Sequence, residues 1–201
     1  MSDGLTRGPL GRCLHVCVDM QEMFRRETEW HTPWLERVLP QAVRLVEAHP
    51  AETIFTRFVP AARPGEGQGT WKGYYERWAS MTRERLGDEM IELVPELARF
   101  APPATVVDKS VYSPWFNSAL PRLLTERQPE AVVVSGGETD VCVLGTVLGA
   151  VDAGYRVVVV HDCLCSSSDE AHEASLSIYR SRYGHQVEVA SAEEVLGAWE
   201  G

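Results

Sequence analysis

Six short apolar runs alternate along the chain with segments of helical pattern, and this alternation limits the fold more than any other feature. Runs such as "CLHVCVDM" (13–20), "EAVVVSGG" (130–137) and "YRVVVVHDC" (155–163) hold nearly continuous apolar stretches and no apolar–polar alternation. Such strands are typical of a parallel sheet that is covered on both faces. We therefore expect an α/β fold with three α/β/α layers and a six-stranded parallel sheet. The other expected strands are 52–59, 103–112 and 185–190.

The segments between these runs carry helix-start signals. Thr32 and Ser113 each precede a proline, which favours them as N-caps of helices over 32–50 and 113–129. Ser167 with Glu170, and Ser191 with Glu194, have the spacing of capping boxes. The remaining expected helices are 139–154, 167–184 and 191–200.

Composition limits the class of protein. With 201 residues and 44% hydrophobic residues, the chain fits a single domain over 1–201. A net charge of −10 disfavours binding to nucleic acid or to an anionic membrane surface. No apolar run resembles an export signal or a membrane span, so we expect a cytoplasmic protein.

The five cysteines do not form a disulfide or zinc pattern. Their number is odd, and no second Cys or His pair lies at a suitable distance from "CLC" (163–165). We expect four of them to be small buried side chains. These four are Cys13, Cys17, Cys163 and Cys165.

Three polar residues are expected to meet at one edge of the sheet. Asp19 ends the first apolar run, Lys109 lies near the end of the third, and Cys142 lies in the first turn after the fourth. Ligands of open parallel sheets bind beyond the carboxyl ends of the strands. Each residue also has a plainer interpretation: Asp19 as a helix cap, Lys109 as a solvated side chain, and Cys142 as a core residue.

Together these residue types have the chemistry of a nucleophilic site. A helix N-terminus and a neighbouring lysine favour the thiolate, the reactive form of cysteine. An aspartate next to the sulfur can accept its proton and later deliver it to a leaving amine. Backbone N–H groups at the helix start can bind an oxyanion. We therefore expect Cys142 to be a thiolate nucleophile, with Asp19 as its acid/base.

At these residues the chain resembles the isochorismatase-like cysteine hydrolases. The resemblance extends over nearly the whole chain, from "HVCVDMQEMF" through "VVDKSVYSPWFNS" to "HDCLCSSSDEAHEASL", and "ETDVCV" matches the nucleophile motif. It implies a Rossmann-type topology and a catalytic triad of Asp19, Lys109 and Cys142. It also implies a cis peptide bond between Gly137 and Glu138, so that the N–H groups of Glu138 and Cys142 form the oxyanion hole.

Two departures narrow the implied chemistry. The Asp-x-His metal motif of nicotinamidases has no counterpart in "FTRFVPAARPGEGQGTW" (55–71), so we expect no metal and no cofactor. Isochorismatases that cleave enol ethers usually lack the cysteine, so Cys142 favours hydrolysis of a C–N bond. The expected enzyme is an amidohydrolase that acts on a small amide, carbamoyl or ureide substrate through a thioester intermediate. An enol-ether hydrolase and a catalytically silent binding protein remain alternatives.

An aromatic-rich insertion at about 60–90 is the expected specificity element. It begins with Pro and Gly residues and then concentrates Trp and Tyr residues. Three roles are consistent with its aromatic residues: the wall of a pocket, packing on the core, or a subunit contact. Arg57 is expected either to bind a substrate carboxylate or to form an ion pair with Glu76 or Asp88. The resemblance also implies a homodimer or homotetramer. The expected substrate-binding residues are Phe24, Arg57, Trp71, Tyr74, Trp78, Tyr112 and Trp115.

Overall fold

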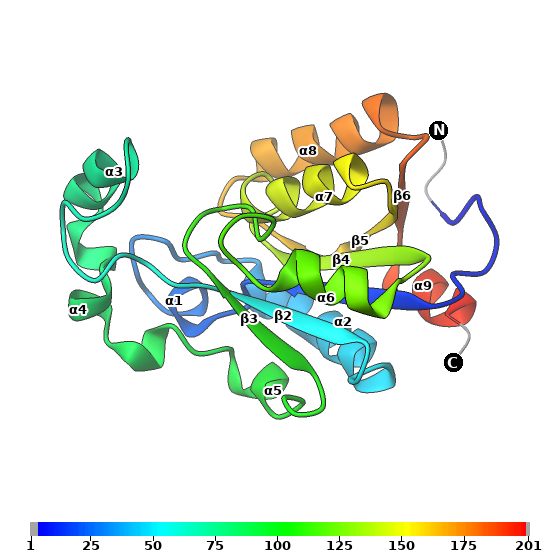
Figure 1. Ribbon diagram of the computed structural model, residues 1–201, viewed down its shortest axis with the longest axis horizontal. Helices are drawn as coiled ribbons and strands as arrows, with labels where there is room; N and C mark the ends of the chain where they lie inside the picture. The colour runs from blue at the N-terminus through cyan, green and yellow to red at the C-terminus, as the bar shows by residue number, and fades with distance from the viewer. Residues whose placement is uncertain (1–3, 200–201) are drawn as a thin grey trace.

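All six expected strands are present in one parallel sheet. The computed structural model describes residues 4–199, and its strands follow the order β3-β2-β1-β4-β5-β6 (Figure 1). Every neighbouring pair is parallel. The strands are β1 (Cys13–Val18), β2 (Thr53–Phe58), β3 (Thr105–Lys109), β4 (Ala131–Gly137), β5 (Arg156–Cys165) and β6 (Val187–Ala190).

Helices cover both faces of this sheet, as the continuous apolar runs predict. One core joins strand residues to α6 (Leu120–Arg127), α7 (Cys142–Asp152) and α8 (Asp169–Arg182). The opposite face packs against α2 (Leu35–Ala48), α5 (Pro95–Ala98) and α9 (Ala192–Ala198). The three-layer α/β/α architecture is therefore confirmed. No helix within residues 4–199 combines enough length with enough apolar residues to cross a membrane.

The strand order reverses at the centre of the sheet. The chain passes from β1 outward to β3 and then returns to place β4 on the other side of β1. The connections after β1 and β4 therefore leave the sheet in different directions, and a crevice opens beyond the carboxyl ends of these two strands. Asp19 follows β1 and Cys142 follows β4, so the topology brings them to the same crevice.

Close contact between β1 and β4 requires glycine at the end of β4. Gly136 has a φ of +104°, and a Cβ atom there would lie 2.1 Å from the carbonyl oxygen of Val18. At Gly137 a Cβ atom would lie 2.8 Å from the sulfur of Cys165. These glycines allow the chain to turn toward Cys142 without steric conflict.

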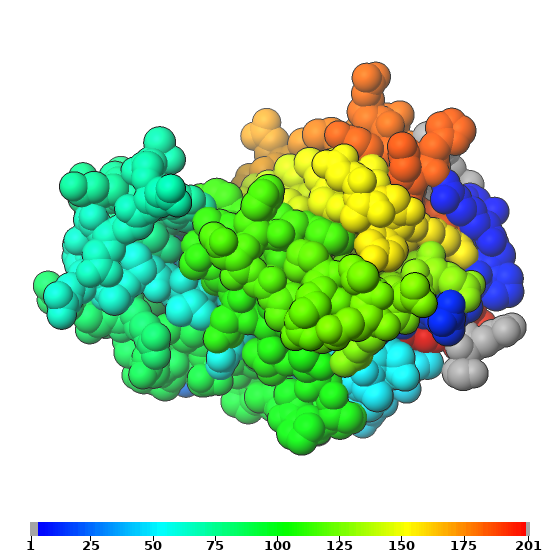
Figure 2. All heavy atoms as spheres, in the orientation of Figure 1, coloured from blue at the N-terminus to red at the C-terminus, as the bar shows by residue number. Residues whose placement is uncertain are grey.

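The insertion folds into several short helices. They are α3 (Trp71–Arg77), the 3₁₀ helix η1 (Ala79–Met81), α4 (Arg83–Leu86) and the 3₁₀ helix η2 (Asp88–Met90). The helical part of the insertion is interrupted at Trp78 and at Thr82. The insertion lies at the same end of the molecule as α1 (Glu22–Arg25), where Figure 2 shows it as a lobe.

Of the four helix starts predicted from cap signals, three are wrong and one is confirmed. Ser191 and Glu194 form the expected capping box of α9. The helix expected from Ser113 begins only at Leu120, because Ser113 donates its hydroxyl to the carbonyl oxygen of Gly145 and lies in a turn. The helix expected from Thr32 begins at Leu35. The helix expected to be capped by Ser167 has its N-cap at Ser168.

All five cysteines are buried free thiols. The expectation for Cys13, Cys17, Cys163 and Cys165 is therefore confirmed. Burial raises the pKa of Cys13 and Cys17 to about 12, so both remain neutral in the folded core at physiological pH.

A buried histidine links stability to pH. His15 in β1 is fully buried between the hydroxyl groups of Thr53 and Ser135, and burial lowers its pKa from 6.5 to about 3. Between these two values the unfolded chain binds a proton at His15 and the folded chain does not. The free energy of unfolding should therefore fall as the pH is lowered through this window, by at most about 1.4 kcal/mol per pH unit from this residue.

Urea unfolding from pH 7 to pH 4 tests this linkage. His15→Gln retains a hydrogen-bonding side chain but does not titrate, so its stability should depend less steeply on pH. His185→Gln, at an exposed position, should keep the wild-type slope. Equal slopes for wild type and His15→Gln would contradict the assignment.

Candidate active site

A buried ion pair lies beyond the carboxyl ends of β1 and β3. The Nζ of Lys109 lies 2.7 Å from Oδ2 of Asp19, and neither side chain is exposed to solvent. Thr56 in β2 donates its hydroxyl to Oδ1 of Asp19 at 2.6 Å. Both oxygens of the carboxylate therefore have a partner, as a charge removed from water requires.

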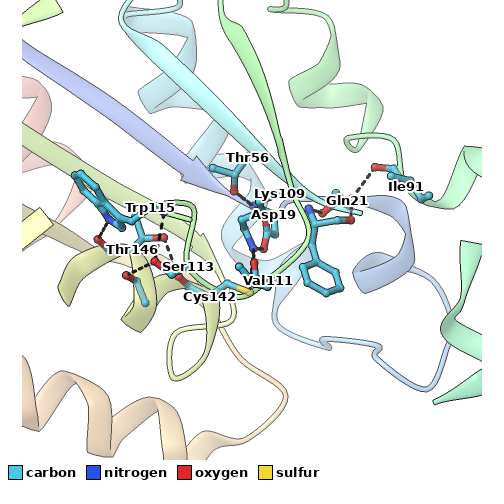
Figure 3. A network of polar contacts seen from close by, with 12 residues as sticks. Asp19, Gln21, Thr56, Ile91, Lys109, Val111, Ser113, Trp115, Cys142 and Thr146 are labelled. Carbon is cyan, nitrogen blue, oxygen red and sulfur yellow. Dashed lines mark hydrogen bonds and ion pairs between the residues drawn. The ribbon is translucent and has the colours of Figure 1, made fainter. Parts of the chain in front are cut away.

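Cys142 completes this cluster at the first residue of α7. Its sulfur lies 3.4 Å from the Nζ of Lys109, which also donates to the carbonyl oxygen of Val111 at 3.2 Å. Figure 3 shows Asp19, Lys109 and Cys142 together, although they come from three separate parts of the chain. The predicted meeting of these three side chains is present in the structure.

The charges of the cluster leave the thiol neutral at rest. Burial is the main cause that raises the pKa of Cys142, and the adjoining Asp19 carboxylate raises it further, whereas Lys109 lowers it. This direction disfavours the expected resting thiolate, because burial and the carboxylate together outweigh the lysine. Burial alone would lower the pKa of Lys109, but Asp19 and Cys142 outweigh it and hold this pKa above its ordinary value.

Two backbone N–H groups close to Cys142 in the sequence lack an acceptor in the described chain. Val141 precedes α7 and provides no side-chain cap, and the Gly137–Glu138 peptide bond is cis. Within residues 4–199, neither the N–H of Glu138 nor that of Cys142 has a hydrogen-bond acceptor. Two donors without partners at a helix N-terminus are suited to bind a negatively charged oxygen.

A second set of contacts holds the loop that carries these donors. The hydroxyl of Thr139 donates to the carbonyl oxygen of Cys165 at 3.1 Å, and it lies 2.8 Å from Nδ1 of His172. Because the hydroxyl hydrogen is used on Cys165, Thr139 accepts the second bond, and His172 carries its proton on Nδ1. Thr139 and His172 therefore position the loop without contacting the sulfur.

A cavity of about 280 Å³ opens onto Cys142. Aromatic side chains form most of its wall, and two carboxylates, Glu29 and Glu138, complete it. Glu138 is oriented by the backbone N–H of Ser167, which donates to its Oε1 at 2.9 Å. The aromatic lining residues are Phe24, Trp30, Phe58, Tyr74, Trp78 and Tyr112.

Four of the seven expected substrate-binding residues lie at this cavity: Phe24, Tyr74, Trp78 and Tyr112. Trp71 instead packs against Tyr74 and Tyr112 and lines a separate cavity of about 690 Å³ beside the insertion. It therefore supports the wall of the cavity beside Cys142 without being part of it.

Arg57 is not at the cavity. It binds both carboxylate oxygens of Asp108, at 2.7 and 3.0 Å, and Glu92 at 2.7 Å. Side chains alternate along a strand, and Thr56 and Phe58 are the residues of β2 that point toward the site. The expectation that Arg57 binds a substrate carboxylate is therefore wrong, as are the alternative pairings with Glu76 and Asp88.

The expectation that Trp115 binds substrate is also wrong. Its Nε1 donates to the carbonyl oxygen of Thr146 at 2.9 Å, and its ring rests on Gly149, where a Cβ atom would lie 2.0 Å from the ring. Figure 3 shows Trp115 beside Thr146, on the other side of Cys142 from Asp19. Trp115 fixes the turn after β3 onto α7 and does not reach the cavity.

Sequence reasoning missed five residues of the cavity wall: Glu29, Trp30, Phe58, Val141 and Ser167. Glu29 and Trp30 lie in the connection between α1 and α2, and Phe58 is the last residue of β2. The Trp30 ring lies within 6.4 Å of the rings of Phe24, Phe58, Tyr74 and Trp78. The aromatic character of Trp30 and its place shortly after Asp19 were the only signals available.

The described residues contain no cluster of three or more His, Cys, Asp or Glu side chains that is suited to a metal ion. The expectation of a site without metal stays a prediction.

Comparison with known proteins assigns a family to this geometry. The model of the isochorismatase domain matches residues 13–193, which include the triad, the cis peptide and all six strands of the sheet. The chain belongs to the isochorismatase family. Members of this family are hydrolases, and they include amidases that act on C–N bonds.

Individual members of the isochorismatase family resemble the chain to different extents. An uncharacterized family protein of Bacillus subtilis, YaaI, is 26% identical over 161 residues, 80% of each chain. A maleamate amidohydrolase of Pseudomonas putida is 32% identical over 91 residues, 45% of this chain and 43% of that protein. The crystal structure of a cysteine hydrolase from Pseudomonas syringae pv. phaseolicola superposes with a TM-score of 0.83 over 98% of each chain, at 24% identity.

Removal of one partner of the buried ion pair should strongly destabilise the fold. Lys109→Met leaves the Asp19 carboxylate buried without a cation, which should lower the free energy of unfolding by about 3–5 kcal/mol. In the double variant Asp19→Asn/Lys109→Met no charge is left uncompensated, so much of this loss should be recovered. Urea unfolding of the single and double variants measures the coupling, and additive losses would contradict it.

Proposed function

We propose that the chain is a cysteine hydrolase that cleaves a C–N bond of a small amide, carbamoyl or ureide substrate through a thioester at Cys142. The observation that carries the proposal is a thiol at the wall of a cavity, in contact with the ammonium group of a buried ion pair with a carboxylate. The names of an amidohydrolase and a cysteine hydrolase among similar proteins support the same chemistry.

The protonation states give the order of the proton transfers. Because the thiol is neutral at rest, Asp19 accepts its proton as the sulfur attacks the carbonyl carbon. Collapse of the tetrahedral intermediate breaks the C–N bond, and Asp19 delivers the proton to the leaving nitrogen. Water then attacks the thioester, releases the acid and returns the proton to the sulfur.

Lys109 and the backbone stabilise the charges that this sequence creates. The ammonium group lies between the carboxylate and the sulfur, so it stabilises the negative charge whichever of the two carries it. The N–H groups of Glu138 and Cys142 are proposed to bind the oxyanion, since one follows the cis peptide and the other begins α7, and neither has an acceptor in the described chain.

The thiol in contact with a buried ion pair favours amide hydrolysis over enol-ether cleavage. An enol ether is cleaved by attack of water and does not require a thiol. A catalytically silent binding protein has no need for a fully buried ion pair in contact with a cysteine, because such a pair is costly to form.

Substitution of Cys142 should separate folding from turnover, because it leaves the buried ion pair of Asp19 and Lys109 intact. Cys142→Ala removes the nucleophile and should reduce ammonia release from a panel of small amides, carbamoyl compounds and ureides to the background rate, with normal circular dichroism. Asp19→Asn should lower kcat by at least about a hundredfold, because it removes the proton carrier.

Cys163→Ala is the matched control, since Cys163 is equally buried but lies in the core beneath α9. It should retain wild-type turnover. Turnover by Cys142→Ala on any member of the panel would reject the thioester mechanism.

The expected homodimer or homotetramer and the expected cytoplasmic location remain predictions. Light scattering with size-exclusion chromatography measures the first, and fractionation of the source cells measures the second.

A further inference from the structure

The wall of the cavity beside Cys142 combines aromatic faces with negative charge. Six aromatic rings line it, and four of them pack around Trp30 at centroid distances of 5.8–6.4 Å. The only ionisable residues among the described lining besides Tyr and Cys are Glu29 and Glu138. Ring faces and carboxylates both attract cations.

No basic side chain offsets this charge at the cavity wall. Of the residues that the structure describes there, none is Lys, Arg or His. Lys109 lies below the sulfur, fully buried and paired with Asp19. The guanidinium of Arg77 lies 4.9 Å from the centre of the Trp78 ring, but Arg77 is not a lining residue.

Arg57 does not supply a positive charge to the cavity wall either. It is the arginine nearest in sequence to the wall residue Phe58, and it is fully engaged with Asp108 and Glu92 away from the cavity. A substrate carboxylate would therefore meet two glutamates and no cation, which is unfavourable in a partly desolvated site.

From this lining we infer that the site selects a small amide whose acyl part carries a positively charged nitrogen, such as an alkylammonium or quaternary ammonium group. The reactive carbonyl lies at Cys142, and the cation lies against the rings around Trp30, next to Glu29. The inference depends on the proposed function, because it names the substrate class of the same site. A volume of about 280 Å³ restricts the choice to small molecules.

Three amides of similar size separate the effects of charge and shape. Trimethylammonioacetamide is a cation, 3,3-dimethylbutanamide is its neutral isostere, and malonamate is an anion. Their affinities are measured by calorimetry on Cys142→Ala, and ammonia release is measured on the wild-type enzyme. The cation should bind at least about tenfold more tightly than its neutral isostere, and malonamate should bind most weakly.

Glu29 provides the matched pair of variants. Glu29→Gln retains an acceptor for the Ser80 hydroxyl, which donates to Glu29, but removes the charge. It should weaken binding of the cation about three- to tenfold and leave the neutral amide unchanged. Glu27→Gln, at an exposed position outside the cavity wall, should change neither.

The binding measurement tests the ligand class, and the turnover measurement tests the proposed hydrolysis. Tight binding of the cation to Cys142→Ala without ammonia release by the wild type supports the assigned ligand class and rejects the proposed amide hydrolysis. If the wild type turns over an amide but the neutral amide binds as tightly as the cation or more tightly, the ligand class is overturned and the proposed hydrolysis stands. The same conclusion follows if malonamate binds most tightly. A cation preference that Glu29→Gln does not reduce also overturns the inference.

Discussion

The buried ion pair between Asp19 and Lys109 is the interaction on which the site depends. It joins the ends of β1 and β3, which are not neighbours in the sheet, and Thr56 of the intervening β2 binds the same carboxylate. Neither charge can be buried alone, so the pair fixes the three strand ends relative to one another. Cys142 reaches Lys109 only because β4 lies beside β1 and ends in glycines that permit a tight turn.

The same burial determines the chemistry of the sulfur. A lysine and a helix N-terminus are usually associated with a stable thiolate, but here the sulfur is removed from water and adjoins a carboxylate. The proton therefore stays on the thiol until a carbonyl carbon is in position. Such an arrangement makes Asp19 necessary as a proton carrier, and it protects the cysteine from reaction in the absence of substrate.

Patterns that depend on sheet topology could be predicted from the sequence. Continuous apolar runs require burial on both faces, and this predicts the parallel sheet. Because the ends of parallel strands converge at one edge, the sequence also predicts that Asp19, Lys109 and Cys142 meet. The errors concern side chains whose direction depends on details beyond the topology. Arg57 and Thr56 are adjacent in the sequence, but strand alternation sends only Thr56 to the site.

Local signals were less reliable than topology. Ser113 before a proline resembles a helix start, but tertiary contacts of the turn at 113–119 with α7 override it, and Trp115 packs on Gly149 as a consequence. Glu29 and Trp30 lie in a connection without a periodic pattern, so nothing in the sequence places them opposite the insertion. The position of Trp30 follows from its packing against Phe58 and against the insertion, which are distant in the chain.

The central claim is that the acyl group passes through Cys142, and partitioning to a second nucleophile tests it most directly. A primary amide and an N-methylamide with the same acyl group are hydrolysed in the presence of hydroxylamine, and the ratio of hydroxamate to acid is measured for each. A shared thioester predicts the same ratio from both, because the leaving amine has departed before the partition. A ratio that changes with the leaving group, or hydrolysis without any hydroxamate, would contradict the account.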